Sequence, residues 1–471
     1  CSQGVLYLAC ESETVDSTRF GVRLDGRLFI ETAIANGASA IVSDSSILQD
    51  TAIQKTNIPI IVTENPLSIL GFICSRLFKE TRPKNLALVT GTNGKTSTVN
   101  FARQIWTGLG YKSCSVGNLG GVCSDGSLVW DRDPVLSVPE TVFMHKMLVG
   151  LAKRGIDHVA MEATSHALFD FRLHDSNANI GAFSNLTRDH LDFHHTMQEY
   201  FRVKMLLFKE VLKRGSWAIL NADTDYFSAA YEVCQSQKHQ IITYGHQAKE
   251  VRLIEVHNTV KGHRLDLLIF EKPYTVDFNL FGDFQISNAL CALSIAIASG
   301  AKPEIAVEEL NNLREVEGRL NQVASLPNGA KIIVDFAHTP DGLRAALEAC
   351  RSFTKGQLVI VFGSAGDRDQ GKRPLMGEIA SRLADLVIVT NDSPGSEDPA
   401  RIRKEILSKA NEAIEIEDRY EAIKFAASQL KENDTLLLAG LGHETSISVG
   451  NKTIPFSDID AARSVSLEFQ S

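Results

Sequence analysis

Residues 85–98, Asn85-Leu-Ala-Leu-Val-Thr90 followed by Gly91-Thr-Asn-Gly-Lys-Thr-Ser-Thr98, indicate the fold of this chain. The apolar run predicts a buried strand, the glycines predict a tight turn, and residues 95–109 predict a helix. A strand, a glycine-rich turn and a helix in this order open many nucleotide-binding α/β domains. Backbone N–H groups of such a turn can surround phosphate oxygens, and the helix N-terminus favours negative charge.

Two polar side chains directly after the turn match this chemistry. Lys95 would reach terminal phosphates, and the hydroxyl of Thr96 can ligate magnesium. The loop is shorter than the usual P-loop, since Gly91 and Gly94 flank only two residues. A glycine turn that binds nothing is the alternative, and the lysine–hydroxyl pair after a buried strand argues against it. We predict an ATP site formed by Gly91, Thr92, Asn93, Gly94, Lys95, Thr96 and Ser97.

Composition limits the classes of function. A net charge of −9 argues against binding to nucleic acid or a membrane surface through bulk electrostatics. No apolar run approaches the roughly 18 residues of a membrane-inserted helix. The eight cysteines are scattered without a Cys-x-x-Cys pair, which favours reduced thiols and a cytoplasmic protein. No signal peptide is recognisable, and because the chain begins at Cys1 we expect its start to be incomplete.

The order of patterns predicts an α/β protein of three domains, as a length of 471 residues suggests. Residues 1–83 form a small α/β unit that ends at a Thr-Arg-Pro linker. Residues 84–317 form a central P-loop-type domain, in which residues 250–280 alternate like antiparallel strands. Residues 318–471 alternate apolar strands with helices, which predicts a mostly parallel, Rossmann-like domain.

Several motifs resemble the Mur ligase family, and they occur in the family's order over residues 85–471. Within the family they are similar to the ligases that add the third peptide residue. Residues 1–83 match less well: Asp16-Ser-Thr-Arg19 has the letters of a uridine-binding segment but follows the first strand, so no uridine residues are assigned. The matching motifs are Gly91–Thr96, Met161–Leu168, Asn185–Asp192, Gly318-Arg319, Asp335–Pro340, Gly363–Asp369, Lys372–Pro374 and Gly442–Glu444.

The resemblance implies a specific reaction. ATP phosphorylates the D-glutamate carboxylate of UDP-MurNAc-L-Ala-D-Glu, and an amino acid then attacks the acyl phosphate. It implies Mg²⁺ held by Thr96, Glu162, His190 and Lys204, with Lys204 carbamylated by carbon dioxide. Only the alignment distinguishes this lysine from Lys209 or Lys213. The catalytic set implied is Lys95, Lys204, His190, Arg319 and His338, and the further ATP contacts are Asn288, Arg319 and Asp335.

Two of these assignments carry conditions. Arg319 and Asp335 would come from the third domain, so the domains must close before the chemistry. His338 either touches the phosphates or only holds the Asp335–Pro340 turn. For the UDP-MurNAc-dipeptide, the implied residues are Ser137, Val138, Thr164, Asp170 and Arg172, where Ser137 and Val138 replace the family's two threonines.

The amino acid is harder to assign, because Asp392-Ser-Pro-Gly395 replaces the usual Asp-Asn-Pro-Arg of diaminopimelate ligases. An arginine can hold the distal carboxylate of diaminopimelate, and glycine cannot. Ser396-Glu-Asp-Pro399 nevertheless favours meso-diaminopimelate over L-lysine, and restoring arginine at Gly395 should strengthen that preference. The amino-acid residues implied are Arg373, Asp392, Ser393, Pro394, Gly395, Gly440 and Glu444.

Alternatives remain open at this point. The chain can be a sibling Mur or folate polyglutamylating ligase with the same ATP core. It can also be a Mur-like structural subunit without catalysis, which the altered loops favour and the intact lysines, Glu162 and His190 oppose. The partners predicted are the nucleotide-linked dipeptide and one amino acid, with no nucleic acid, no membrane insertion and a monomeric state.

Overall fold

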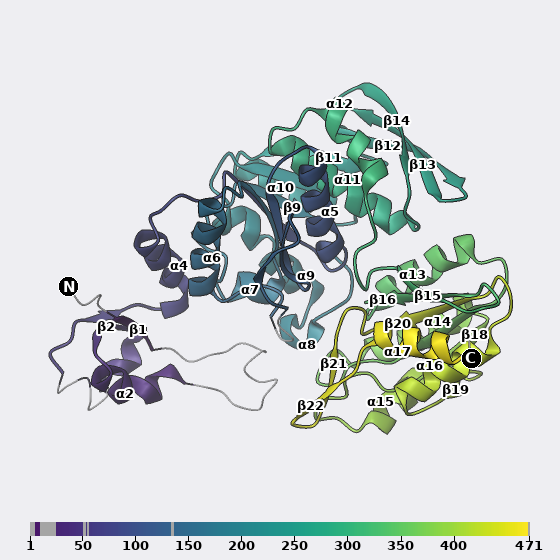
Figure 1. Cartoon of the computed structure of the whole chain (residues 1–471). Coiled ribbons are helices and arrows are strands. Elements are labelled where there is room, and N and C mark those ends of the chain that lie inside the picture. Colours follow the sequence, from purple (N-terminus) through teal and green to yellow (C-terminus); the bar gives the residue numbers. More distant parts are fainter. Residues whose placement is uncertain (1–4, 10–24, 50–52, 54–55, 133–135, 470–471) are drawn as a thin grey trace.

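The computed structural model describes residues 5–9, 25–49, 53, 56–132 and 136–469. The described residues form four sheets: a three-stranded, an eleven-stranded and a six-stranded sheet with helices around them, and a two-stranded hairpin (Figure 1). They lie, in chain order, within the three ranges predicted for the domains. The predicted α/β class is confirmed. None of the helices in the described ranges is long and apolar enough to cross a membrane.

The first unit is a small parallel sheet in the order β1-β2-β3, with helix α2 beside it. Its core is a handful of aliphatic side chains that include Ile30 and Ile41. Helix α4 then packs against α6 of the middle domain. The segment Asp16–Arg19 lies outside the described residues. The bounds are β1 Val5–Leu8, α2 Ile30–Ala35, β2 Ala38–Ser43, β3 Ile60–Val62, α4 Pro66–Leu77 and α6 Thr141–Lys153.

The middle domain contains the eleven-stranded sheet, ordered β14-β13-β12-β11-β10-β9-β4-β8-β5-β6-β7. Strand β4 is fully buried between its parallel neighbours β8 and β9, because separate apolar cores cover the two faces of the sheet. The bounds are β4 Asn85–Thr90, β5 Ser113–Gly117, β6 Gly120–Cys123, β7 Leu128–Trp130, β8 His158–Glu162, β9 Ile180–Phe183, β10 Trp217–Asn221 and β11 Gln240–Gly245.

Helices α5 and α11 pack together over one face of this sheet, while α6, α7, α9 and α10 contribute to the other. The antiparallel strands predicted within residues 250–280 are present as β12, β13 and β14. The bounds are α5 Lys95–Gly108, α7 Ser165–Phe169, α8 Leu191–His194, α9 Met197–Lys204, α10 Phe227–Ser236, β12 Val251–Thr259, β13 Gly262–Ile269, β14 Lys272–Phe278 and α11 Asp283–Ala298.

The C-terminal domain has the strand order β15-β16-β20-β17-β18-β19, parallel except for the edge strand β15. Helices α13, α14 and α15 cover one face, and α16 and α17 cover the other. The bounds are β15 Asn321–Ser325, β16 Lys331–Asp335, α13 Pro340–Phe353, β17 Leu358–Phe362, α14 Lys372–Leu383, β18 Leu386–Val389, α15 Pro399–Leu407, β19 Ile414–Glu415, α16 Arg419–Gln429, β20 Thr435–Ala439, β21 Ser446–Val449, β22 Lys452–Pro455 and α17 Asp458–Glu468.

Candidate functional site

The phosphate loop connects β4 to α5 and is shaped by a close approach at Gly94. This residue has φ of +88°, and a Cβ built on it would lie 2.1 Å from Oδ1 of Asn288. Only glycine therefore fits between the loop and α11. Asn288, predicted on the adenine side, donates from Nδ2 to Oε1 of Gln285 at 3.1 Å. The loop and the predicted adenine residue are thus one packed unit.

The segment after β9 holds the loop in place from its other side. The N–H of Thr92 donates to the carbonyl of Asn185 at 3.0 Å, and the N–H of Asn93 donates to Oδ1 of Asn185 at 2.9 Å. The hydroxyl of Ser184 donates to the carbonyl of Asn93 at 2.8 Å. Strands β4 and β9 are parallel neighbours, so their carboxyl ends bring the two motifs to the same sheet edge.

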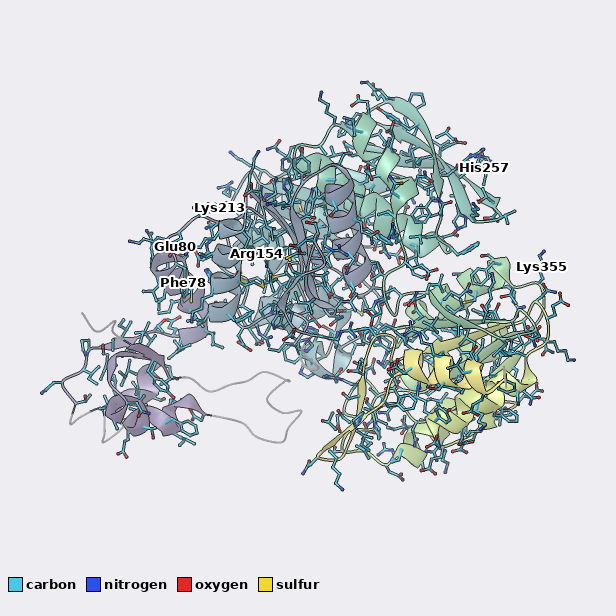
Figure 2. The ribbon with its side chains drawn as sticks, viewed as in Figure 1. Phe78, Glu80, Arg154, Lys213, His257 and Lys355 are labelled. Atoms are coloured by element: carbon cyan, nitrogen blue, oxygen red, sulfur yellow. The ribbon has the colours of Figure 1, made fainter. Side chains whose placement is uncertain are left out.

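Two lysines converge on this loop. Nζ of Lys95 donates to the carbonyls of Gly91 and Thr92, each at 2.9 Å, and Nζ of Lys204 donates to the Gly91 carbonyl at 2.9 Å. Lys204 is 1% exposed, and burial together with the Lys95 charge lowers its pKa well below the usual range. Lys209 and Lys213 are exposed, and Lys213 extends from the surface in Figure 2. Burial therefore separates Lys204 from the two lysines that the sequence could not exclude.

Glu162 ends β8 and is fully buried. Its Oε1 accepts the Thr96 hydroxyl at 2.8 Å and the N–H of Asn118 at 2.9 Å. Its Oε2 is buried and has no hydrogen-bond partner among the described residues. A buried carboxylate oxygen without a donor is costly unless a cation neutralises it. These oxygens fit a hard divalent ion such as Mg²⁺.

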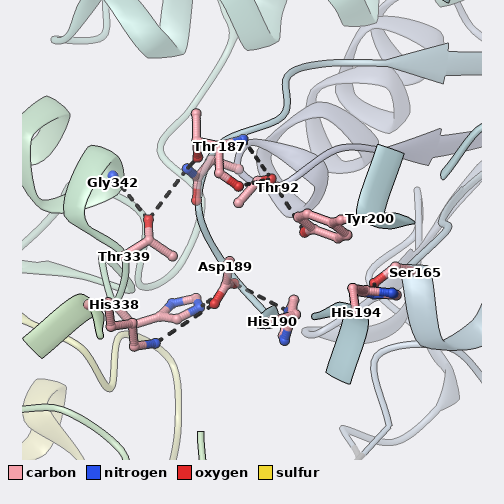
Figure 3. A network of polar contacts seen from close by, with 12 residues as sticks. Thr92, Ser165, Thr187, Asp189, His190, His194, Tyr200, His338, Thr339 and Gly342 are labelled. Atoms are coloured by element: carbon pink, nitrogen blue, oxygen red, sulfur yellow. Dashed lines mark hydrogen bonds and ion pairs between the residues drawn. The ribbon is translucent and has the colours of Figure 1, made fainter. Parts of the chain in front are cut away.

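His190, a further predicted metal ligand, lies near the ring of Tyr200, which Lys204 also contacts. The centroids of His190 and Tyr200 are 6.1 Å apart (Figure 3). Nζ of Lys204 is 4.4 Å from the Tyr200 centroid. Burial lowers the pKa of His190 to about 3, although Asp189 at 3.2 Å opposes the shift. The imidazole is therefore neutral at physiological pH, as a metal ligand must be.

Residues of the C-terminal domain complete this site. Arg319 donates to the Thr96 hydroxyl at 3.1 Å and stacks over Phe336, with its guanidinium carbon 4.5 Å from the ring centroid. Asp335 accepts the N–H of Leu320 at 2.6 Å, and burial raises its pKa to about 6. Nδ1 of His338 lies 2.8 Å from the Phe336 carbonyl, to which it can only donate. This contact holds the ring against the Asp335–Pro340 turn, while Nε2 of His338 lies 3.6 Å from Asp189.

The residues predicted for the dipeptide make internal contacts. Asp170 and Arg172 are buried and joined at 2.9 Å, while the Thr164 hydroxyl caps α7 by accepting the N–H of Ala167 at 3.2 Å. The Ser137 hydroxyl donates to Oδ1 of Asn118. Val138 is 1% exposed within the apolar core, so its side chain is not presented to a ligand. Each of the four polar side chains thus has a partner within the middle domain.

On the amino-acid side, the assignment of Arg373 meets an obstacle. Its side chain is fully buried, with NH2 2.8 Å from Glu397 Oε1 and NH1 2.8 Å from Glu405 Oε2. Its guanidinium is thus already held by two carboxylates of its own domain. Arg368, which belongs to the Gly363–Asp369 motif but was given no role from the sequence, is only partly buried and lines a cavity of about 630 Å³ between the two domains. The other residues around this cavity are Arg188, Leu191, Asp192, His195, Asp369, Gln370 and Gly371.

The Asp392–Gly395 loop is also built differently from the expectation. Gly395 has φ of +57°, and a Cβ there would lie 2.1 Å from Oδ2 of Asp367. The N–H of Gly395 donates to the Ser448 carbonyl at 3.0 Å, which ties the loop to hairpin β21–β22. An arginine at 395 would need a left-handed backbone and a shift of the Asp367 side chain, so restoring it carries a cost in stability that the sequence did not indicate.

The remaining residues predicted for the amino acid lie close to this loop. Asp392 Oδ1 accepts the N–H of Ser393 at 2.6 Å, and Ser393 Oγ accepts the N–H of Ser448 at 3.3 Å. A Cβ on Gly440 would lie 2.5 Å from Asp392 Oδ2, and a Cβ on Gly366 would lie 1.8 Å from the Pro394 carbonyl oxygen. The N–H of Glu444 donates to the Leu441 carbonyl at 2.9 Å.

Sequence reasoning missed several residues that shape the site. Asn118, in the turn after β5, contacts Glu162 and Ser137, and only the glycines on its two sides hinted at it. Tyr200 carried no signal beyond its helical spacing to Lys204. Arg368 belongs to the motif Gly363–Asp369. From the sequence, amino-acid binding was assigned to Arg373, in the next motif Lys372–Pro374, and Arg368 was given no role.

Comparison with known proteins agrees with this geometry. The Mur ligase middle domain matches residues 89–296, and the Mur ligase glutamate ligase domain matches residues 318–442. A UDP-N-acetylmuramoyl-L-alanyl-D-glutamate–2,6-diaminopimelate ligase of Brucella melitensis biotype 1 is 41% identical over 93% of this chain and 88% of its own length. The protein of that name from Agrobacterium fabrum is 39% identical over 96% and 90%.

A solved structure of a protein with the same name shares the fold, with a TM-score of 0.67 at 27% identity. The similarity covers 100% of this chain and 94% of that one. The middle-domain match covers the phosphate loop and the buried glutamate, and the second match covers the C-terminal arginine. The chain belongs to the Mur ligase family.

Proposed function

We propose that this protein is the ATP-dependent ligase that adds meso-diaminopimelate, as the third peptide residue, to UDP-MurNAc-L-Ala-D-Glu in peptidoglycan biosynthesis. The relatives at 39–41% identity that bear this activity in their names support the choice over a folate ligase. The observation that carries it is the Thr96 hydroxyl, which contacts Glu162 of its own domain and Arg319 of the C-terminal domain. The nucleotide loop, the buried carboxylate and the closing domain meet at this atom.

The same contacts argue against a structural subunit without catalysis. The buried Lys204 amine, the partly buried Lys95 amine and an unpartnered carboxylate oxygen cost folding free energy, because each loses hydration without a full set of partners. Ser137 and Val138 show that the acceptor side has changed, yet Lys95, Glu162, His190, Lys204 and Arg319 are all retained. A protein without phosphoryl transfer has no use for that set.

The residues divide the reaction between the two domains. The N–H groups of residues 91–97 and the N-terminus of α5 would bind the ATP phosphates, and Lys95 would turn from the Gly91 carbonyl to the terminal phosphate. Arg319 would neutralise charge that develops as the phosphoryl group moves to the D-glutamate carboxylate. Thr96, Glu162, His190 and Lys204 would hold Mg²⁺, which neutralises phosphate charge when bound.

We further propose that Lys204 carries a carbamate in the active enzyme. The uncharged amine nitrogen attacks the carbon of CO₂, an N–C bond forms, and the nitrogen loses a proton to solvent. The product is an anion whose oxygens suit a hard metal. Support comes from its burial and from Lys95, a cation that shares the Gly91 carbonyl with it. Carbamylation would place an anion beside the Lys95 cation, and the two would attract each other.

For the amino acid, we propose that Arg368 rather than Arg373 binds a carboxylate of the substrate. Arg368 borders the interdomain cavity, whereas the Arg373 guanidinium is already enclosed by Glu397 and Glu405. An arginine fork holds a carboxylate with two parallel hydrogen bonds. Ser393 lies in the same loop and could also contact the substrate. L-lysine stays the second candidate, because Gly395 has no side chain to bind the distal carboxylate of diaminopimelate.

One chain supplies every group named here, which supports a monomer as the functional unit. A cytoplasmic location is the further proposal, supported by the use of ATP and a nucleotide-linked substrate. Six of the eight cysteines are described, and all six are buried free thiols, as expected for a reducing compartment.

The test is steady-state kinetics with MgATP, UDP-MurNAc-L-Ala-D-Glu and one of four amino acids: meso-diaminopimelate, its LL isomer, L-lysine or L-ornithine. Phosphate release and the mass of the product would be measured together. We expect turnover that requires both acceptor and amino acid, with the highest kcat/KM for meso-diaminopimelate. A higher kcat/KM for L-lysine would reassign the amino acid, and no turnover with any of the four would reject the ligase.

A further inference from the structure

Two consecutive residues of the middle domain reach into the C-terminal domain with opposite charges. Nε and NH2 of Arg188 donate to the two oxygens of Asp369 at 2.9 and 3.0 Å. The carboxylate of Asp189 lies between His338, with Nε2 at 3.6 Å, and Lys372, with Nζ at 3.8 Å. A cation followed by an anion in one domain therefore meets an anion and a cation in the other.

The contacts differ from an ordinary surface ion pair, which contributes little to stability. The Arg188 guanidinium binds the Asp369 carboxylate through two nitrogens, and this bidentate geometry gives the strongest ion pairs. Asp369 is 7% exposed, and its Oδ1 also accepts the N–H of Gly371 at 2.9 Å, so the carboxylate is held before the arginine arrives. A Cβ on Gly371 would lie 2.3 Å from NH2 of Arg188, so the guanidinium rests directly on the backbone.

The second pair is buried more deeply. Asp189 is 5% exposed and Lys372 is 3% exposed, so solvent screens their attraction weakly. Asp189 also lies 3.2 Å from Nε2 of His190, the next residue in the chain. The carboxylate thus touches the predicted metal ligand on one side and the C-terminal domain on the other (Figure 3).

The same segment leads back to the phosphate loop. The N–H of Thr187 donates to the Thr92 hydroxyl at 3.1 Å. Nδ2 of Asn93 lies 3.4 Å from the Thr187 hydroxyl and 3.5 Å from the Thr339 hydroxyl of the C-terminal domain. A displacement of the C-terminal domain would therefore disturb residues 187–190 at both ends, and with them the imidazole of His190.

We propose that Arg188 and Asp189 form a two-part charge latch with Asp369 and Lys372, which holds the C-terminal domain over the ATP site and orients His190. The four residues are positioning residues, because they act through domain placement and touch no reacting atom. The latch also sets the reach of Arg319 to Thr96. Its kinetic consequence rests on the proposed function, whereas its effect on domain placement does not.

The experiment reverses the charges of the Arg188–Asp369 pair, which is the more exposed of the two pairs in the latch. Arg188→Asp and Asp369→Arg would each place like charges together, and the double variant would restore an opposite pair. Spin labels at Lys213→Cys and Lys355→Cys, exposed sites on the two domains, would report the interdomain distance by pulsed electron resonance (Figure 2). Arg264→Asp, which breaks an exposed Arg–Asp pair within the middle domain, is the matched control.

Each single reversal should broaden the distance distribution and lower kcat about tenfold, while melting temperatures stay near that of the parent. The double variant should recover most of both losses, and the control should change neither. Unchanged distances in the single variants would overturn the latch, as would a double variant no better than the singles. Distances that respond as expected in a protein without ligase activity would support the latch and reject only the proposed function.

Discussion

The phosphate loop of the middle domain and the amino-acid loop of the C-terminal domain both carry family motifs, but only the first has the contacts that its letters imply. In the loop 91–97, Lys95 donates to the Gly91 carbonyl, Thr96 donates to Glu162, and Gly94 packs against Asn288, so the motif residues lie together. Near the amino-acid loop, the Arg373 guanidinium is paired with Glu397 and Glu405. Within the loop, Gly395 is packed against Asp367. Backbone recognition of phosphate depends on local sequence, whereas selection of an amino acid depends on side chains that distant residues place.

The largest effect is expected at Lys95. Lys95→Ala should lower the ligation rate at least about a thousandfold, because a positioned charge on the transferred phosphoryl group is lost. Circular dichroism should show an unchanged fold. Exposed Lys209→Ala is the matched control and should keep full activity. Acceptor-dependent ADP release by Lys95→Ala near the parental rate would contradict the assignment.

Lys204→Ala should lower the rate about a hundredfold or more, since the carbamate oxygens would be missing from the metal site. Added formate should restore part of the activity by occupying similar positions. In ¹³C-bicarbonate, the parent should show a carbamate carbon signal by NMR that Lys204→Ala lacks and exposed Lys213→Ala retains. A parent protein that is active without any such signal would rule the carbamate out.

Substitutions of Arg368 and Arg373 should have opposite effects on amino-acid binding and on stability. Arg368→Ala should raise the KM for the amino acid about tenfold or more and leave the melting temperature unchanged, because it loses a carboxylate partner. Arg373→Ala should instead destabilise the protein by about 3 kcal/mol, since Glu397 and Glu405 lose their partner. Melting curves and amino-acid titrations separate the two. A stable Arg373→Ala protein with a raised KM would return the role to Arg373.

The smallest effect on catalysis is expected at Gly395. Gly395→Arg should cost about 1–3 kcal/mol, because φ of +57° and the Asp367 carboxylate both oppose a side chain there. We expect the ratio of kcat/KM for meso-diaminopimelate to that for L-lysine to stay within about threefold. Adding Asp367→Gly should recover part of the lost stability. A tenfold shift of the ratio towards diaminopimelate at an unchanged melting temperature would show that the loop accepts the arginine.

Much of the fold followed from periodicity. Strand β4 and the antiparallel run of residues 250–280 were predicted with nearly the observed bounds, because each has an uninterrupted pattern. The hairpin of β5 and β6 was missed, since its strands are short and lie beside glycines. That hairpin brings Asn118 to Glu162, so the omission hid part of the site as well.

The sequence alone determined the α/β class, the phosphate loop and the identity of Lys95 and Thr96 as its polar residues. These features depend on neighbours in the chain, which strand and turn propensities place without outside help. The tertiary structure decided which lysine of three is buried, which arginine of two faces the cavity, and how Arg188 and Asp189 meet the C-terminal domain. Burial and ion pairing depend on residues more than a hundred positions apart, such as Gly91 and Lys204, whose contact exists only once β4 and α9 have packed.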